Sequence, residues 1–160
     1  MSTETSSSDF FDTECSCPCG KTRFQVETKP ILRFFCHCKI CQKLYDKAYS
    51  DVNVVRTKHV HLPDNGIEFS TFRAPPALQR GLCSHCHKPV AGLLTMLPGL
   101  KLAFIAGENF SQQDKLPAPL GHVFYHRKQQ NCEDSLPKIG GYWRSEWQIS
   151  KWLLPRLMHS

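Results

Sequence analysis

The sequence lacks any run of about 18 consecutive apolar residues, so it predicts no transmembrane helix. It also lacks a block of Lys and Arg that resembles a nucleic-acid-binding arm, although its formal net charge is +6. The first fourteen residues are polar and acidic, without the basic and apolar regions of a signal peptide. We therefore expect a cytoplasmic location, no membrane contact and no nucleic-acid partner.

Cysteine, by contrast, is abundant, with nine in 160 residues. Structural disulfides are rare in a reducing compartment, and an odd number of closely spaced cysteines favours metal binding or thiol chemistry. Eight of the nine cysteines lie in three short groups, and only Cys132 stands alone. We expect Cys132 to be a small, partly buried residue.

Short stretches of alternating apolar residues between turn signals predict one mainly β domain with little helix. The expected strands cover residues 22–28, 31–38, 48–62, 67–74, 100–107 and 121–128. The sequence PDNG (63–66) carries a hairpin signal, and the prolines within 112–121 predict a loop. Residues 143–154 predict an amphipathic helix that Pro155 ends.

Three tryptophans lie in the region of this expected helix, at positions 143, 147 and 152. Aromatic residues at helical spacing usually form the face that packs on a core. We therefore expect Trp143, Trp147 and Trp152 to contribute to core packing.

Two pairs of cysteines have the spacing of zinc ligands. Cys17 and Cys19 form a CxC pair, and Cys83 and Cys86 form a CxxC pair. Each pair can supply half of the tetrahedron of thiolates that Zn²⁺ takes in structural sites. Together they predict a closed, structural zinc site that joins the first strand region to the middle of the chain.

Cys36, Cys38 and Cys41 form a third group with CxCxxC spacing. Three protein ligands leave a fourth position for water or substrate, as in catalytic zinc sites. A zinc ion there would supply a bound thiol as its nucleophilic thiolate, or polarise a carbonyl group. This pattern therefore favours an enzyme that joins a thiol to an aldehyde.

Two alternatives remain open at this point. A fourth protein ligand would close the CxCxxC group into a second structural site. The candidates for this ligand are His37, His85, His87 and Cys15. Cys15 could also replace Cys17 in the four-cysteine site.

The order of these motifs resembles the glutathione-dependent formaldehyde-activating enzyme family, which includes centromere protein V. The matching segments are CPCG (17–20), Phe24, CHCKICQK (36–43), CSHC (83–86), HVFYHRK (122–128) and SLPKI (135–139). The resemblance implies a zinc-stapled antiparallel β-tent fold, as in methionine sulfoxide reductase B. The resemblance spans about residues 15–140, which we expect to be the zinc-binding domain. The polar, acidic residues 1–14 predict a poorly ordered tail, and residues 141–160 a C-terminal extension with a short helix packed on the domain.

For the site, the resemblance implies a structural zinc on Cys17, Cys19, Cys83 and Cys86. It implies a second, labile and catalytic zinc on Cys36, Cys38 and Cys41, and it leaves Cys15 as a free thiol in the tail. The implied activity is addition of glutathione, or a similar thiol, to formaldehyde or a related small aldehyde, formally a carbon–sulfur lyase reaction run in reverse. Lys39 and Lys43 would attract the glutathione carboxylates, or be plain solvated charges.

Two positions depart from the family pattern, because Asp46 and His87 stand where glycine is usual. Glycine at such positions marks a positive φ or a close backbone approach. We expect the Asp46 side chain to narrow or recharge the entrance near the three-cysteine site. For His87 we expect a role in capping the CxxC turn rather than in binding metal.

Two other functions compete with the enzyme hypothesis. The first is a non-catalytic zinc module that binds a protein or nucleic-acid partner, for which the net charge and the C-terminal tryptophans argue. The second is a reductase like methionine sulfoxide reductase B, an analogy that rests on the fold alone. Only Cys132 could serve as its nucleophile, and its acidic surroundings, QNCEDS, disfavour a thiolate.

Overall fold

The chain was analysed as a computed structural model, which describes residues 11–71 and 78–158. Within these residues ten strands form two sheets, together with two α-helices and four short 3₁₀ helices. The expected mainly β fold with little helix is therefore confirmed. None of the helices in the described residues is long and apolar enough to span a membrane.

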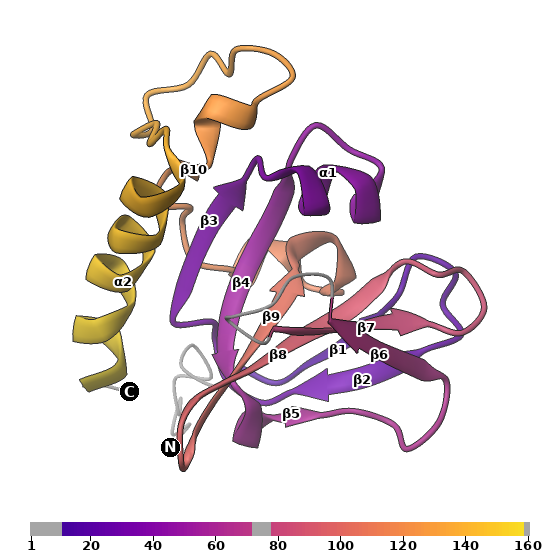
Figure 1. Ribbon diagram of the computed structural model, residues 1–160. Helices are drawn as coiled ribbons and strands as arrows, with labels where there is room; N and C mark the ends of the chain where they lie inside the picture. Colours follow the sequence, from indigo (N-terminus) through magenta and orange to yellow (C-terminus); the bar gives the residue numbers. More distant parts are fainter. Residues whose placement is uncertain (1–10, 72–77, 159–160) are drawn as a thin grey trace, which may run out of the picture.

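The smaller sheet has three antiparallel strands and the larger has seven (Figure 1). The smaller sheet has the order β1 (Thr13–Ser16), β2 (Arg23–Val26), β5 (Val60–His61). The larger has the order β10 (His122–Val123), β3 (Leu32–Cys36), β4 (Ser50–Arg56), β9 (Leu100–Ala106), β8 (Pro89–Leu97), β7 (Gln79–Cys83), β6 (Ile67–Thr71). Only the β10–β3 pair is parallel.

The larger sheet separates two hydrophobic cores. Successive side chains of a strand point to opposite faces, and β4 accordingly places Val55 in one core and Val54 in the other. The first core combines residues of the two sheets, among them Phe24 and Ile105. The second core includes Phe34 of β3 and residues of α2 (Tyr142–Met158). The two groups of cysteines that could hold a metal ion are divided between these cores.

Helix α2 lies beside β3 and β10 at one edge of the larger sheet (Figure 1). It does not end at Pro155, as the sequence predicted, but continues to Met158. Proline lacks the N–H that would bond to the carbonyl of Lys151, and both residues are exposed, so water can solvate that carbonyl. The next carbonyl, of Trp152, accepts a 2.7 Å hydrogen bond from Arg156 Nη1.

The prediction for the tryptophans was wrong for two of the three. Trp143 is 79% exposed and Trp147 is 68% exposed. The helix instead buries Ser145, Leu153 and Leu157, which face the domain. Trp152 is half-buried and its ring lies 6.4 Å from that of Phe34.

Two local predictions also need correction. The PDNG turn does not form a hairpin, because it leads from β5 in the smaller sheet to β6 in the larger. The expected strand at 121–128 is only the two residues of β10. It stops at Phe124, whose φ of 54° is left-handed and whose N–H donates to Ser145 Oγ at 2.8 Å.

The expected tail at residues 1–14 divides into two parts. Residues 1–10 lie outside the described residues. Phe11 packs edge-on against Phe110 in the first core, and β1 begins at Thr13. Cys15, expected as a free thiol in the tail, instead lies in β1 with 1% of its surface exposed, and burial raises the pKa of its thiol to about 12.

Candidate metal centres

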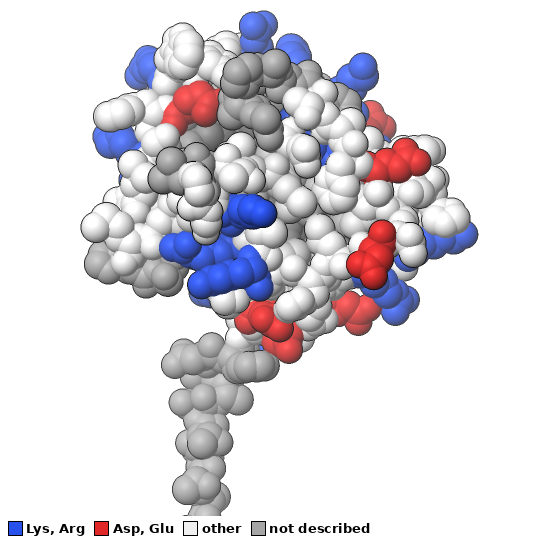
Figure 2. Space-filling view, turned by 60° about the horizontal axis from the view of Figure 1, so that its bottom comes forward, with Lys and Arg blue, Asp and Glu red and all other residues white. Residues whose placement is uncertain are grey.

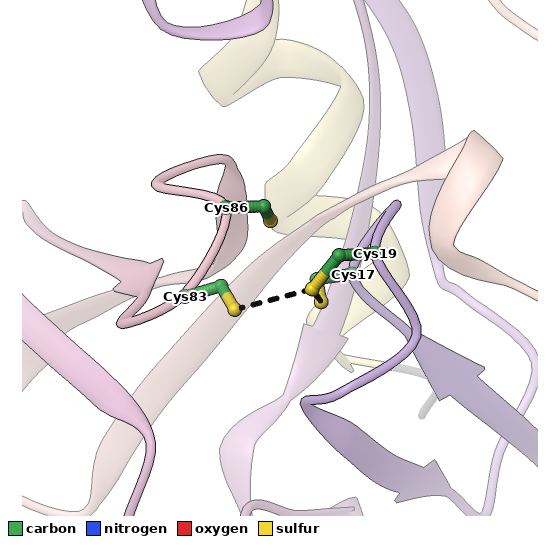
Figure 3. Close-up of side chains that lie close together, drawn as sticks. All are labelled: Cys17, Cys19, Cys83 and Cys86. Carbon is green, nitrogen blue, oxygen red and sulfur yellow. Dashed lines mark hydrogen bonds between the residues drawn. The ribbon is translucent and has the colours of Figure 1, made fainter.

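Four cysteines from distant parts of the chain point toward one another (Figure 3). They are Cys17, Cys19, Cys83 and Cys86, and their sulfur atoms all lie within 4.8 Å of one another. We call them the four-thiol cluster. Cys17 and Cys19 follow β1 of the smaller sheet, whereas Cys83 ends β7 of the larger sheet. The cluster therefore joins the two sheets at the edge of the first core.

The sulfur–sulfur distances fit a metal ion rather than a disulfide. Cys17 Sγ lies 3.2 Å from Cys19 Sγ, which lies 3.7 Å from Cys83 Sγ. A disulfide needs about 2.05 Å, while thiolates at about 2.3 Å from zinc at tetrahedral angles lie about 3.8 Å apart. The donor set and spacing fit a zinc ion, and the four thiols would fill all of its tetrahedral positions.

The environment of Cys83 favours its thiolate form. Burial raises the pKa of Cys83, but hydrogen bonds to its sulfur outweigh this effect and lower the pKa to about 5. Thr22 Oγ1 donates to Cys83 Sγ at 3.2 Å, and the backbone N–H of His85 donates at 3.4 Å. Hydrogen bonds of this kind orient a metal ligand and stabilise its charge.

The second group consists of Cys36, Cys38 and Cys41, and we call it the three-thiol cluster. Its sulfur atoms also lie within 4.8 Å of one another. Cys36 ends β3, Cys38 is the N-cap of α1 (Lys39–Tyr45), and Cys41 lies in the first turn of that helix. The N–H of Cys41 donates to Cys38 Sγ at 3.4 Å, so the strand–helix junction itself gathers the sulfurs.

The thiols of this cluster differ in their pKa values. Hydrogen bonds from Cys36 and Cys41 hold the pKa of Cys38 well below its ordinary value, and the positive charge of Arg80 acts in the same direction. The hydrogen bond to Cys38 raises the pKa of Cys36 well above its ordinary value. The cluster therefore favours one thiolate, the form that binds metals and acts as a nucleophile.

The three-thiol cluster lines a cavity of about 200 Å³. Ser50 of β4 and Tyr45 of α1 line it too. Ser50 is 2% exposed. Its Oγ meets no partner with full hydrogen-bond geometry among the described residues, although the hydroxyl lies close enough to the Cys41 thiol to interact with it. A buried hydroxyl gains from a well-formed hydrogen bond, so a ligand in this cavity would be stabilised by bonding to Ser50.

Tyr45 and Ser50 also line a second hollow, of about 360 Å³. None of its described lining residues is a cysteine. Its charged side chains pair with protein groups: Lys47 bonds Glu108, and Asp51 pairs with Arg33 at 2.8 Å. This hollow therefore offers neither thiolates nor unpaired charge among those residues.

A chain of hydrogen bonds lies behind the three-thiol cluster. His37 Nε2 lies 2.8 Å from His122 Nδ1, and His122 Nε2 lies 2.8 Å from Asp134 Oδ2. Asp134 also pairs with Lys138 at 2.9 Å. These hydrogen bonds connect Asp134, in the segment after β10, to His37, which directly follows β3. They thereby fix the end of β3.

None of the four candidate fourth ligands groups with the three-thiol cluster in the described residues. His37 is hydrogen-bonded to His122, and a ring nitrogen of His37 lies within 4.8 Å of the sulfur of Cys132, which is half-buried as expected. His85 and His87 are exposed beside the other cluster, and Cys15 lies in the first core. In these residues the three-thiol cluster therefore has no fourth protein ligand.

The two positions that depart from the family pattern share one backbone conformation. Asp46 has a φ of 51° and His87 a φ of 60°, so both occupy the left-handed region that favours glycine. Asp46 caps the C-terminus of α1, and the His87 N–H donates to Cys83 O at 2.9 Å. Asp46 is exposed and does not line the cavity, so it does not narrow it; that its charge affects the entrance stays a prediction.

Sequence reasoning missed Arg80 and Ser50. Lys39 and Lys43, the expected basic residues, are exposed and do not line the cavity, whereas Arg80 of β7 does. The CxxC motif three residues beyond Arg80 fixes the end of β7, but nothing in the sequence indicates that β7 passes the three-thiol cluster. Only the order of strands in the larger sheet brings them together.

Comparison with known protein families matches residues 12–127 to the family described as "Glutathione-dependent formaldehyde-activating enzyme". None of the curated proteins compared with the chain matches it. The match covers most of the 160 residues and includes every cysteine of both clusters. The chain therefore belongs to the glutathione-dependent formaldehyde-activating enzyme family.

Proposed function

We propose that this protein adds a thiol, such as glutathione, to formaldehyde or a related small aldehyde. The carbon–sulfur bond forms as the C=O π bond breaks, and the thiol proton passes to the carbonyl oxygen, with no change in oxidation state. In this proposal Cys36, Cys38 and Cys41 hold a catalytic zinc, and Cys17, Cys19, Cys83 and Cys86 hold a structural zinc. One observation carries the proposal: the three-thiol cluster combines a ligand position that no described residue fills with a cavity.

A zinc ion on the three thiolates would supply a Lewis acid and would lower the pKa of a bound thiol. The residues of the chain have three further tasks. The end of β3 and the start of α1 hold the sulfurs in place. Ser50 Oγ can donate a hydrogen bond to the oxygen on which negative charge develops. Arg80 provides positive charge that favours a thiolate at Cys38.

The test is acceleration of the spontaneous reaction between glutathione and formaldehyde. Exchange NMR with ¹³C-formaldehyde measures the rate at which free aldehyde and adduct interconvert. We expect this rate to rise in proportion to the concentration of zinc-loaded protein, and to fall to the spontaneous rate after chelation. No acceleration by the zinc-loaded protein would contradict the proposal.

A non-catalytic zinc module is the second candidate function. The observation that favours it is the pair of exposed tryptophans, Trp143 and Trp147, one turn apart on α2. On the face drawn in Figure 2, several Lys and Arg side chains gather at the lower left, with Asp and Glu next to them. Binding to a DNA duplex that weakens steeply with salt would favour a nucleic-acid partner.

A further inference from the structure

The cavity beside the three-thiol cluster is closed on one side by α2. Ile149 and Leu153 of this helix line it, together with Glu146 and Ser150. The family match ends at residue 127, before α2 begins. The three thiols therefore come from the part shared with the family, while one wall of their cavity comes from the C-terminal segment outside the match.

The remaining walls are mainly apolar. They are formed by side chains that include Leu94, Phe104 and Phe124. Arg80 is the only Lys or Arg that lines the cavity among the described residues. Glutathione carries two carboxylates and an ammonium group, and burying such charges without partners is unfavourable. The apolar part of the cavity therefore suits the aldehyde better than the polar ends of the thiol.

Formaldehyde alone would leave most of this space empty. A water molecule occupies about 30 Å³ in the liquid, so the two heavy atoms of formaldehyde fill roughly 60 Å³ of the 200 Å³ cavity. The remaining volume can hold about five more carbon atoms, at about 30 Å³ each. Burying an apolar chain against these walls removes apolar surface from water, so a substrate that fills the cavity is favoured.

We propose that the aldehyde taken by this site carries an apolar chain of about five carbons, as hexanal does. The carbonyl group lies at the three-thiol cluster and Ser50, and the chain lies against Leu94 and the α2 side chains Ile149 and Leu153. This assignment rests on the proposed function and names its substrate class. The reaction is the same addition, with the thiol proton passing to the oxygen of the longer aldehyde.

Binding of unreactive alcohols tests the cavity separately from the chemistry. We expect the dissociation constant, measured by calorimetry, to fall about fourfold for each methylene between ethanol and 1-hexanol, the gain of moving a methylene from water to an apolar wall. It then levels off for longer alcohols, because the cavity is full. A dissociation constant that does not depend on chain length would overturn the assignment.

Two adjacent leucines of β8 provide a matched pair of variants. Leu94 lines the cavity, while Leu93 packs against the first core, and both are half-buried. Leu94→Ala removes three carbons from the wall, so the chain length at which the affinity levels off should increase by about three carbons. Leu93→Ala should leave that length unchanged. If Leu94→Ala does not fold, Ile149→Ala on α2 makes the same test from the opposite wall.

The activity test compares aldehydes of similar intrinsic reactivity. We expect kcat/KM for hexanal to exceed that for acetaldehyde by about two hundredfold, from four buried methylenes. Acceleration with formaldehyde but equal kcat/KM for acetaldehyde and hexanal would overturn the substrate class and leave the proposed function intact. If alcohols bind in the cavity while no aldehyde reacts faster, the proposed function fails and the assignment of the aldehyde chain fails with it.

Discussion

The two cysteine clusters are built from the same residue type at similar spacings, yet they differ in number and surroundings. The four-thiol cluster joins the two sheets and fills its own tetrahedron. The three-thiol cluster lies at one strand–helix junction and opens on a cavity. The comparison teaches that the same chemical group can serve stability or reaction, depending on whether a ligand position and space for a substrate remain.

The largest expected effect is that of removing a thiol from the four-thiol cluster. A structural zinc site contributes roughly 10 kcal/mol or more to folding, which is comparable with the whole stability of a domain. Cys83→Ser should therefore abolish the cooperative thermal transition measured by circular dichroism. A variant that kept the wild-type melting temperature would show that this cluster does not hold the sheets together.

The same change in the three-thiol cluster should spare the fold and remove the activity. Cys38→Ser should lower the rate of thiol addition by about a thousandfold, because Lewis-acid stabilisation is worth several kcal/mol and each 1.36 kcal/mol is tenfold. Its melting temperature should stay close to that of the wild type. Cys132→Ser is the control outside both clusters, and its rate should equal that of the wild type. If Cys132→Ser lost as much activity as Cys38→Ser, the catalytic role of the three-thiol cluster would be contradicted.

A smaller effect should follow from Thr22→Val, which keeps the shape of the side chain and removes the hydroxyl. Thr22 is buried and donates to Cys83 Sγ at 3.2 Å. Loss of such a hydrogen bond typically weakens metal binding by about tenfold or more. Competition with a chromophoric chelator should show weaker zinc binding by the four-thiol cluster, while the rate of thiol addition per zinc-loaded molecule stays the same. An affinity equal to that of the wild type would show that this hydrogen bond does not support the site.

The smallest effect concerns the hydrogen-bonded chain behind the three-thiol cluster. Hydrogen bonds from Lys138 and His122 lower the pKa of Asp134 to about 2. A lowered pKa means that the stabilisation is present above the unfolded value near 4 and is lost as the pH falls from about 4 towards 2. Asp134→Asn should therefore lower the urea midpoint at neutral pH, and the difference from the wild type should shrink in acid.

Asp64→Asn provides the control for this prediction, because Asp64 is an exposed carboxylate in the turn after β5. Comparing the two variants at each pH cancels the release of metal that acid causes in both. A difference between Asp134→Asn and Asp64→Asn that did not change with pH would show that the charge of Asp134 does not stabilise the fold.

The local parts of each cysteine cluster could be predicted from the sequence. A CxC or CxxC turn brings its two sulfurs together wherever it lies, and four ligands are what a structural zinc takes. The choice of which distant pairs share a site came from the family resemblance, and the structure gathers the same groups of four and three. The usual family glycines at positions 46 and 87 indicated either a positive φ or a close backbone approach, and the structure shows the positive φ.

What the sequence could not predict depends on contacts between distant segments. Arg80 reaches the cavity only because β7 lies in the same sheet as β3 and β4. The helical spacing of Trp143 and Trp147 places both on one face of α2, but spacing alone does not tell which face meets the domain. The strand expected at 121–128 stops at Phe124 because its N–H bonds to Ser145, a residue 21 positions later.

The central claim is that one cluster stabilises the fold and the other carries out the reaction. Timed chelation of the wild-type protein, with zinc content, circular dichroism and rate of thiol addition followed together, tests it most directly. The account predicts two zinc ions per chain, of which one leaves first and takes the activity with it while the melting curve is retained. Loss of both ions together with unfolding, or activity that survives removal of the first ion, would contradict it.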